Sequence, residues 1–119
     1  MSAGVYNFTL EQGASLRTKA TLKDIDDNGV DLTGFTFSGH IRKNFLDQIK
    51  VAQFTFEIAD QGTDTGSFYF ILTPAQTAAI PNTNDTEFPY YYDIEMTTGV
   101  DQVKRILSGV VTLSPQVTR

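Results

Sequence analysis

The stretch LRTKATLK, from Leu16 to Lys23, decides the fold class. Its leucine, threonine and alanine side chains at every second position alternate with arginine, lysine and threonine. Because successive side chains of a β-strand point to opposite faces, this period of two predicts a strand with one buried face and one cationic face. An amphipathic helix would instead place its apolar residues three and four positions apart.

The same alternation recurs along most of the chain. The apolar positions of the further predicted strands are Tyr6, Phe8 and Leu10; Phe35, Phe37 and Ile41; Ala52, Phe54, Phe56 and Ile58; Phe68, Phe70 and Leu72; Tyr90, Tyr92, Ile94 and Met96; and a last strand from about Val103 to Leu113. Turn residues that reach positive φ at little cost separate the runs, as in Asp27-Asn28-Gly29 and Thr98-Gly99. In the last strand, Gly109 is a candidate for a bulge. About seven short strands with frequent turns predict an all-β sandwich or small barrel.

One segment departs from the strand pattern. Thr73 is a helix-capping residue, Pro74 occupies the first helical position, alanines follow, and Pro81 ends the run. We expect one short helix near residues 74–80, inside the longest connection between two strands, which suits a crossover between sheets. No repeat or linker divides the chain, so residues 1–119 are expected to form a single β-sandwich domain.

Composition excludes several classes of function. The chain has 119 residues, a net charge of −5 and no cysteine, so disulfides and thiolate metal sites are excluded. There is no basic patch for nucleic acid and no apolar run of about 20 residues for a membrane span. The first 13 residues lack the basic and apolar regions of a signal peptide, so we expect synthesis in a cytoplasm without a Sec-type export route.

Catalysis has little support in the sequence. The single histidine, His40, falls on the outward side of a predicted strand, and nothing places a serine and an aspartate beside it. The acidic residues lie mostly in turns and on outward faces. We therefore expect a solvated or interface histidine, no enzymatic activity and no cofactor.

The segment that follows the opening strand contains the first half of a calcium loop. Asp24, Asp26 and Asn28 stand at the first three ligand positions of an EF-hand, and Gly29 stands at the turn position. The closing glutamate position is occupied by Phe35, and the flanking residues are typical of strands, so an EF-hand is rejected. Two alternatives remain: a looser calcium site that uses these three side chains, and a tight turn in which they satisfy local backbone N–H groups.

Several apolar side chains fall on the outward side of predicted strands. They are covered either by the chain itself or by another protein. The candidates for partner contact are Tyr69, Ile71, Tyr91, Ile106 and Val110. The cationic face of Arg17, Lys19 and Lys23 either pairs with an acidic neighbour or is simply solvated.

A set of ordered motifs carries a resemblance to a known class of proteins. In chain order they are FTLEQG (residues 8–13), DIDDNGVDLTG (24–34), IRK (41–43), GSFYFILT (66–73) with the PAQTAAI helix, YYDI (91–94), RILSGVVTL (105–113) and VTR (117–119). This order, which covers nearly the whole chain, resembles small immunoglobulin-like virion proteins of tailed bacteriophages. It is similar to the N-terminal attachment domains of baseplate and receptor-binding-protein adaptors.

The resemblance implies an immunoglobulin-like antiparallel β-sandwich that serves as a tail, baseplate or neck component. Such a component contacts other virion structural proteins, forms a homo-oligomer in the assembled particle, and is assembled in the bacterial host cytoplasm. The resemblance implies no catalytic residues and no metal ligands. The alternative function is a carbohydrate- or ligand-binding β-sandwich, which would use a platform of Tyr90, Tyr91 and Tyr92, or calcium at the Asp24–Asn28 loop.

Overall fold

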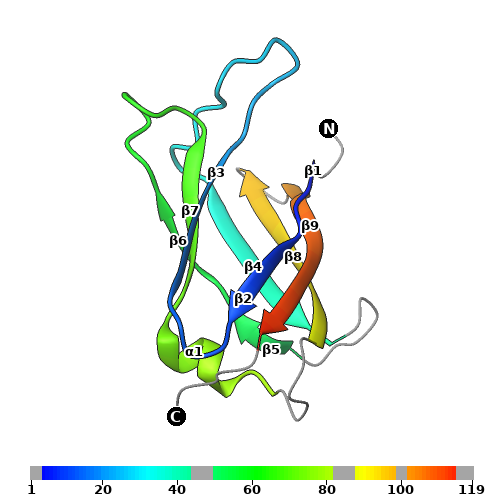
Figure 1. Ribbon diagram of the computed structural model, residues 1–119. Helices are drawn as coiled ribbons and strands as arrows, with labels where there is room; N and C mark the ends of the chain where they lie inside the picture. Colours follow the sequence, from blue (N-terminus) through cyan, green and yellow to red (C-terminus); the bar gives the residue numbers. More distant parts are fainter. Residues whose placement is uncertain (1–3, 44–49, 82–87, 99–101, 115–119) are drawn as a thin grey trace.

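The computed structural model describes residues 4–43, 50–81, 88–98 and 102–114, and these residues form nine strands and one short helix (Figure 1). The strands are β1 (Gly4–Val5), β2 (Phe8–Glu11), β3 (Leu16–Thr21), β4 (Thr36–Arg42), β5 (Lys50–Gln53), β6 (Thr55–Ile58), β7 (Ser67–Leu72), β8 (Phe88–Thr98) and β9 (Gln102–Ser114). The helix α1 spans Pro74–Ala79, where the sequence predicts it. No helix in these four ranges is both long and apolar enough to span a bilayer.

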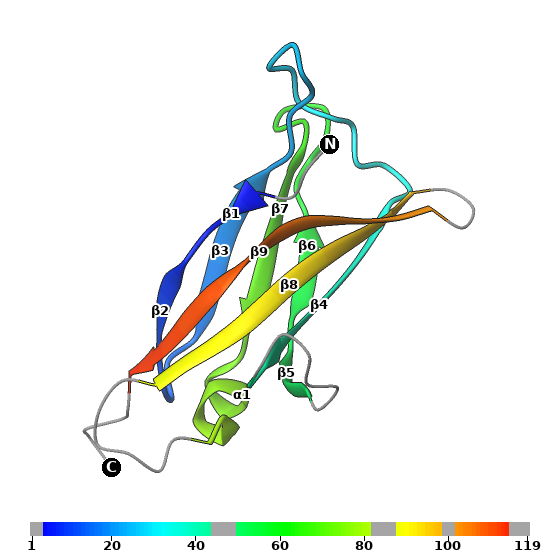
Figure 2. The same cartoon turned by 90° about the vertical axis from the view of Figure 1, so that its right-hand side faces the viewer.

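The strands form two sheets that face each other across the core (Figure 2). The larger sheet has the order β1-β9-β8-β4-β5, with β2 also pairing along β9, and the smaller sheet has the order β3-β7-β6. All neighbours are antiparallel except β1 and β2, which run parallel to β9. This is the strand order of an immunoglobulin-like sandwich, so the predicted all-β fold is confirmed.

The count of nine strands exceeds the expected seven because one predicted strand is divided and because β1, at Gly4–Val5, precedes the first predicted run. The run from Ala52 to Ile58 is interrupted at Phe54, whose backbone N–H donates to the Gly39 carbonyl at 3.0 Å. Before this point β5 pairs with β4 in the larger sheet, and after it β6 pairs with β7 in the smaller sheet. The chain thus passes from one sheet to the other at Phe54, whose side chain is only 2% exposed and fills the core.

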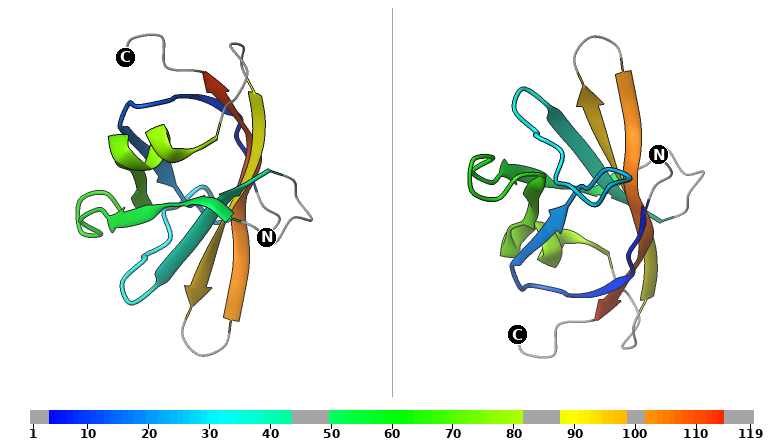
Figure 3. Two further views of the ribbon diagram at one scale, coloured as in Figure 1. Left: turned by 90° about the horizontal axis from the view of Figure 1, so that it is seen from below. Right: turned by 90° about the horizontal axis from the view of Figure 1, so that it is seen from above.

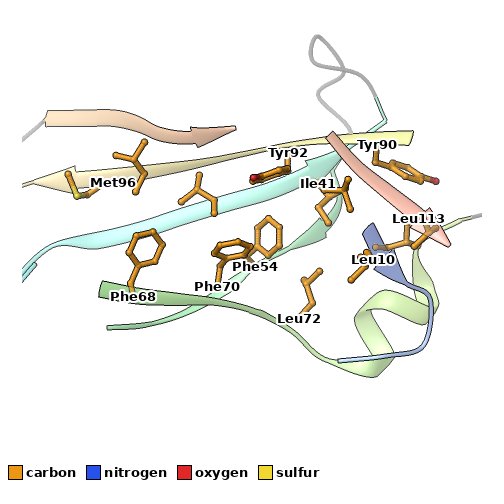
Figure 4. Close-up of a cluster of buried hydrophobic side chains, with 14 of the residues drawn as sticks. Leu10, Ile41, Phe54, Phe68, Phe70, Leu72, Tyr90, Tyr92, Met96 and Leu113 are labelled. Carbon is orange, nitrogen blue, oxygen red and sulfur yellow. The ribbon is translucent and has the colours of Figure 1, made fainter. Parts of the chain in front are cut away.

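Aromatic rings from both sheets meet in the centre of the core (Figure 4). Phe70 lies 5.4 Å from Phe54 and 6.0 Å from Phe8 between ring centroids, and Tyr92 lies 5.2 Å from Phe8. The inward positions that the alternation predicts on β7 and β8 are all buried: Phe68, Phe70, Leu72, Tyr90, Tyr92, Ile94 and Met96. Edge-to-face and offset ring contacts of this kind add about 0.5–1.5 kcal/mol each beyond simple burial.

Two tyrosine hydroxyls of β8 form hydrogen bonds to the backbone of other segments of the chain. The Tyr90 hydroxyl donates to the Pro81 carbonyl, the pattern of the tyrosine corner found in immunoglobulin-like sandwiches. The Tyr92 hydroxyl donates to the Tyr6 carbonyl at 2.5 Å. Burial raises the pKa of both phenols above the usual value, so both remain protonated donors.

One residue on β9 faces the opposite way from the prediction. Ile94 pairs with Leu107 and Glu95 pairs with Arg105, so Ile106 is the extra residue of a β-bulge. The bulge turns Ile106 into the core, where it is 8% exposed, and the prediction of an outward Ile106 is therefore wrong. Gly109, the predicted bulge, pairs regularly with Tyr92. A Cβ at Gly109 would collide with the Tyr6 carbonyl, so glycine permits the close approach of the N-terminal segment.

Some predicted features lie outside the described residues. Gly99 of the predicted Thr98-Gly99 hairpin turn lies outside the described residues, although β8 and β9 pair up to Thr98 and Gln102. The VTR motif at residues 117–119 also does.

The helix α1 holds the turn between β2 and β3. A capping box starts the helix, because the Thr73 and Gln76 side chains each bind the other's backbone N–H. The fully buried Thr77 hydroxyl accepts from the Gly13 N–H at 3.0 Å and donates to the Ala14 carbonyl at 2.8 Å. The helix therefore fixes the position at which the chain moves from the larger sheet to the smaller one.

We predict that Thr77→Val lowers the free energy of unfolding by about 1–3 kcal/mol, because valine has the same shape but leaves the buried Gly13 N–H without its acceptor. Urea unfolding followed by fluorescence measures this change. The matched control is Thr36→Val at an exposed position of β4, which should change stability little. Equal effects of the two substitutions would contradict the role of the Thr77 hydroxyl.

Candidate functional site

The calcium-like loop is held in shape by the side chain of its first residue, Asp24. Oδ1 of Asp24 accepts backbone N–H groups from Asp26 at 2.9 Å and from Asn28 at 3.0 Å. Asp27 has a φ of 66°, and Lys23 bridges to Gly29 across the turn. The geometry is that of a tight Asx turn. Within the described ranges, no group of three or more His, Asp or Glu side chains is placed to hold a metal ion.

The base of this loop is fastened to the β6–β7 turn by one side chain. Oε1 of Gln61 accepts the N–H groups of Leu32 at 3.0 Å and Gly66 at 2.8 Å, and its Nε2 donates to the carbonyls of Ala59 and Ser67. All four hydrogen-bonding positions of this carboxamide are therefore used. The residues of the calcium-like motif thus serve a structural connection at the end of the sandwich.

The five predicted contact residues do not form one patch. Tyr69 and Ile71 lie on the outer face of the smaller sheet, whereas Tyr91 and Val110 pair across strands on the outer face of the larger sheet. These faces are on opposite sides of the sandwich, as the end-on views show (Figure 3). The fifth residue, Ile106, belongs to the core.

The outer face of the smaller sheet is partly covered by the chain's own charged side chains. The guanidinium carbon of Arg17 lies 4.0 Å from the centre of the Tyr69 ring, and its NH1 lies 2.5 Å from Oε2 of Glu57. Nζ of Lys19 lies 2.5 Å from Oδ2 of Asp64, and this contact raises the pKa of the lysine and lowers that of the aspartate. The aromatic and cationic groups of this face therefore already have partners within the chain.

The outer face of the larger sheet carries a different arrangement, which we call the Asp93 cluster: Arg42, Asp93 and Arg105. Oδ1 of Asp93 lies 3.6 Å from NH1 of Arg42, and Oδ2 lies 3.6 Å from Nε of Arg105. The Asp93 side chain is only 14% exposed and that of Arg42 25%, although both project from the outside of the sheet. Nε of Arg42 is buried and has no hydrogen-bond partner in the described part of the chain. Beside the cluster stands the Tyr91–Val110 pair.

His40 belongs to the same face, since β4 places it opposite Asp93 on β8. Partial burial lowers the pKa of the imidazole, and the positive charges of Lys50 and Arg42 lower it further. Asp93 and Glu95 act in the opposite direction without cancelling the effect. The outward histidine that the sequence predicts is therefore held toward its neutral form beside a cationic cluster.

Sequence reasoning missed the Asp93 cluster. The available signal was Asp93 itself, an outward carboxylate between the inward Tyr92 and Ile94. Finding its partners required the register that places Arg42 and Arg105 on neighbouring strands, and the bulge at Ile106 shifts that register for Arg105.

The three consecutive tyrosines do not form a ligand platform. Tyr90 and Tyr92 are 3% and 2% exposed and point into the core, whereas Tyr91 is on the outer face. Alternate residues of one strand cannot share a face, so a stacking surface made from all three is excluded.

No protein-family model matches the chain, and no curated protein matches it significantly. Among solved structures, it is similar to a sialyltransferase from Photobacterium damsela, with 11% identity and a TM-score of 0.41. It is also similar to a family 123 glycoside hydrolase from Clostridium perfringens, with 12% identity and a TM-score of 0.39. Each match covers 97% of this chain but only 18% and 24% of the respective enzyme chains. The activity of neither enzyme is transferred to this chain.

We predict that His40→Gln weakens the loss of stability on mild acidification. The folded-state pKa of His40 lies below the unfolded value of about 6.5, so its contribution to stability is present above that pH and is lost as the pH falls through the folded-state pKa. Urea midpoints at about pH 7.5 and about pH 5.5 measure the effect. The wild type should lose more stability than the variant over this interval, and equal losses would contradict the burial of His40.

Proposed function

We propose that the protein is a structural component of a tailed-bacteriophage virion, in the tail, baseplate or neck, and that it acts by protein–protein contact without catalysis. Two observations support the proposal. The ordered motifs from residues 8 to 119 resemble those of small immunoglobulin-like virion proteins. The outer face of the larger sheet combines an aromatic–aliphatic pair with a half-buried arginine–aspartate cluster.

The face of the Asp93 cluster carries the proposal because its composition suits a protein interface. Tyrosine and arginine are enriched in such interfaces, and they dominate binding energy where a partner excludes water from them. The Arg42 side chain as a whole is 25% exposed, so its guanidinium would offer charged N–H groups to a partner carbonyl or carboxylate. Tyr91 and Val110 would supply apolar contact beside the charged groups.

In the assembled particle this face would meet another virion protein or an identical copy, and repetition by symmetry would give a ring. Assembly would take place in the bacterial host cytoplasm. Neither nucleic acid nor membrane contact is part of the proposal.

We predict that Val110→Asp prevents incorporation into particles while the purified variant remains folded. The added carboxylate would lose its water at the contact and would have no cation to pair with, because both arginines of this face already pair with Asp93. The matched control is Ile71→Asp on the outer face of the smaller sheet, which should incorporate normally. The measurement is complementation of phage that lack the gene, with circular dichroism as a folding check. Exclusion of the Ile71 variant alone would contradict the assignment of the face.

The class of protein is tested separately. Particles purified on a density gradient from the source strain should contain the chain in multiple copies by quantitative mass spectrometry, and tail or capsid genes should flank its gene. Presence in the lysate but absence from intact particles, together with metabolic genes on either side, would overturn the proposal.

A further inference from the structure

The calcium-like loop contains the dipeptide Asn28-Gly29. An asparagine loses ammonia when the backbone nitrogen of the next residue attacks its side-chain carbonyl carbon, and asparagine is for this reason among the residues that heat damages. A glycine in the next position favours the reaction, because it has no side chain to obstruct the ring that forms and leaves the main chain free to rotate. The reactivity of Asn28 therefore depends on whether the fold leaves both reacting groups free.

The reacting groups of Asn28 and Gly29 have no partner in the described part of the chain. The dipeptide lies in the loop that leads from β3 to β4, and Asn28 is exposed (Figure 1). Among the described residues, none forms a hydrogen bond with the Asn28 carboxamide, and none accepts one from the Gly29 N–H. Lys23 and Gly29 form the non-hydrogen-bonded pair of an antiparallel bridge, so the backbone bonds of the bridge lie on either side of Gly29.

Asn7, the other asparagine in the described ranges, has the opposite environment. Its Oδ1 accepts the Val110 N–H at 2.9 Å, so its carboxamide is held against β9. The residue that follows it is Phe8, whose ring packs 5.2 Å from that of Tyr92 in the core. Asn7 therefore serves as an internal reference for an asparagine that the fold protects.

Asp24 restrains the reactive dipeptide. Its Oδ1 accepts the Asn28 N–H at 3.0 Å, and its own N–H donates to the Asn28 carbonyl at 2.8 Å. Closing the ring rotates the peptide group that carries this carbonyl, so the bonds to Asp24 oppose the reaction. Because Asp24 is exposed, these bonds open more readily than those of the core.

We propose that Asn28 is a deamidation site and that the side chain of Asp24 slows the reaction. The Gly29 nitrogen forms a bond with Cγ of Asn28, and the carboxamide nitrogen leaves as ammonia with the proton that the Gly29 nitrogen gives up. A cyclic succinimide remains. Water, the sole co-reactant, then opens one of its two carbonyl–nitrogen bonds and gives either aspartate or isoaspartate.

The two products change the loop in different ways. Both add a negative charge beside the carboxylates of Asp26 and Asp27. Isoaspartate also adds a methylene group to the main chain between the N–H and the C=O that bind Asp24, so the isoaspartate form should lose these bonds. The inference uses only the chemistry of this loop and is independent of the virion assignment.

Peptide mapping by mass spectrometry, with separation of aspartate from isoaspartate, tests the site. The purified full chain is incubated at neutral pH and physiological temperature, beside a sample unfolded in guanidinium chloride. In the folded chain we expect conversion of Asn28 to both products while Asn7 stays intact. Conversion of Asn28 should be faster in the unfolded sample, where Asp24 no longer restrains it.

The variant Asp24→Ala tests the restraint. Conversion of Asn28 should become about fivefold faster, the change expected from the net loss of one hydrogen bond. The matched control is Asp31→Ala, which removes a similar bond outside the hairpin, since Oδ1 of Asp31 accepts the Thr33 N–H at 3.0 Å. The control should convert at the wild-type rate. Hydrogen exchange at the core amides of β7 shows that both variants remain folded.

Three outcomes would overturn the inference. An Asn28 that stays intact in the folded chain after the unfolded sample has converted would remove the site, as would conversion of Asn7 at the rate of Asn28. Equal rates at Asn28 in the wild type and in the folded Asp24→Ala variant would remove the role of Asp24.

Discussion

The structure depends on four aromatic rings that meet between the sheets. Phe8 comes from β2, Phe70 from β7 and Tyr92 from β8, and Phe54 stands where the chain leaves β5 for β6. In antibody domains the corresponding layer is held by a disulfide and a buried tryptophan. This chain has neither cysteine nor tryptophan, so ring packing supplies the connection between its two sheets. The hydroxyl of Tyr92 extends the cluster to the N-terminal segment through the Tyr6 carbonyl.

Because these rings point into the core, the residues next to them on each strand must point to the outer faces of the sheets. With Tyr92 and Ile94 in the core, Asp93 must project from the other face, and its neighbours on β4 and β9 bring Arg42 and Arg105 beside it. On the smaller sheet, burial of Phe68 and Phe70 leaves Tyr69 outward, where Arg17 covers it. The core therefore determines which of the two outer faces is closed by the chain's own side chains and which retains an arginine donor without a partner in the described residues.

Local alternation was sufficient to predict most of the fold. It gave the inward residues of β3, β7 and β8 and the short helix, because a period of two and a capping box are properties of neighbouring residues. It did not give the division at Phe54 or the parallel pairing of β1 and β2 with β9, since both depend on the position of the other sheet. Local alternation also did not predict the bulge at Ile106, because one extra residue reverses the faces of a strand without any change in composition. For the same reason Val110 was assigned to the correct face and Ile106 was not. The Asp93 cluster is a contact between distant segments, so only the three-dimensional arrangement reveals it.

The central claim, that the protein works by contact through the outer face of the larger sheet, is tested most directly by photo-cross-linking in assembled particles. A benzophenone amino acid placed at Tyr91, and separately at Tyr69, would be activated in intact particles and its products identified by mass spectrometry. The account predicts specific cross-links from position 91 to another virion protein or to an identical copy. Cross-links from position 69 alone, in particles that incorporate both variants equally, would contradict it.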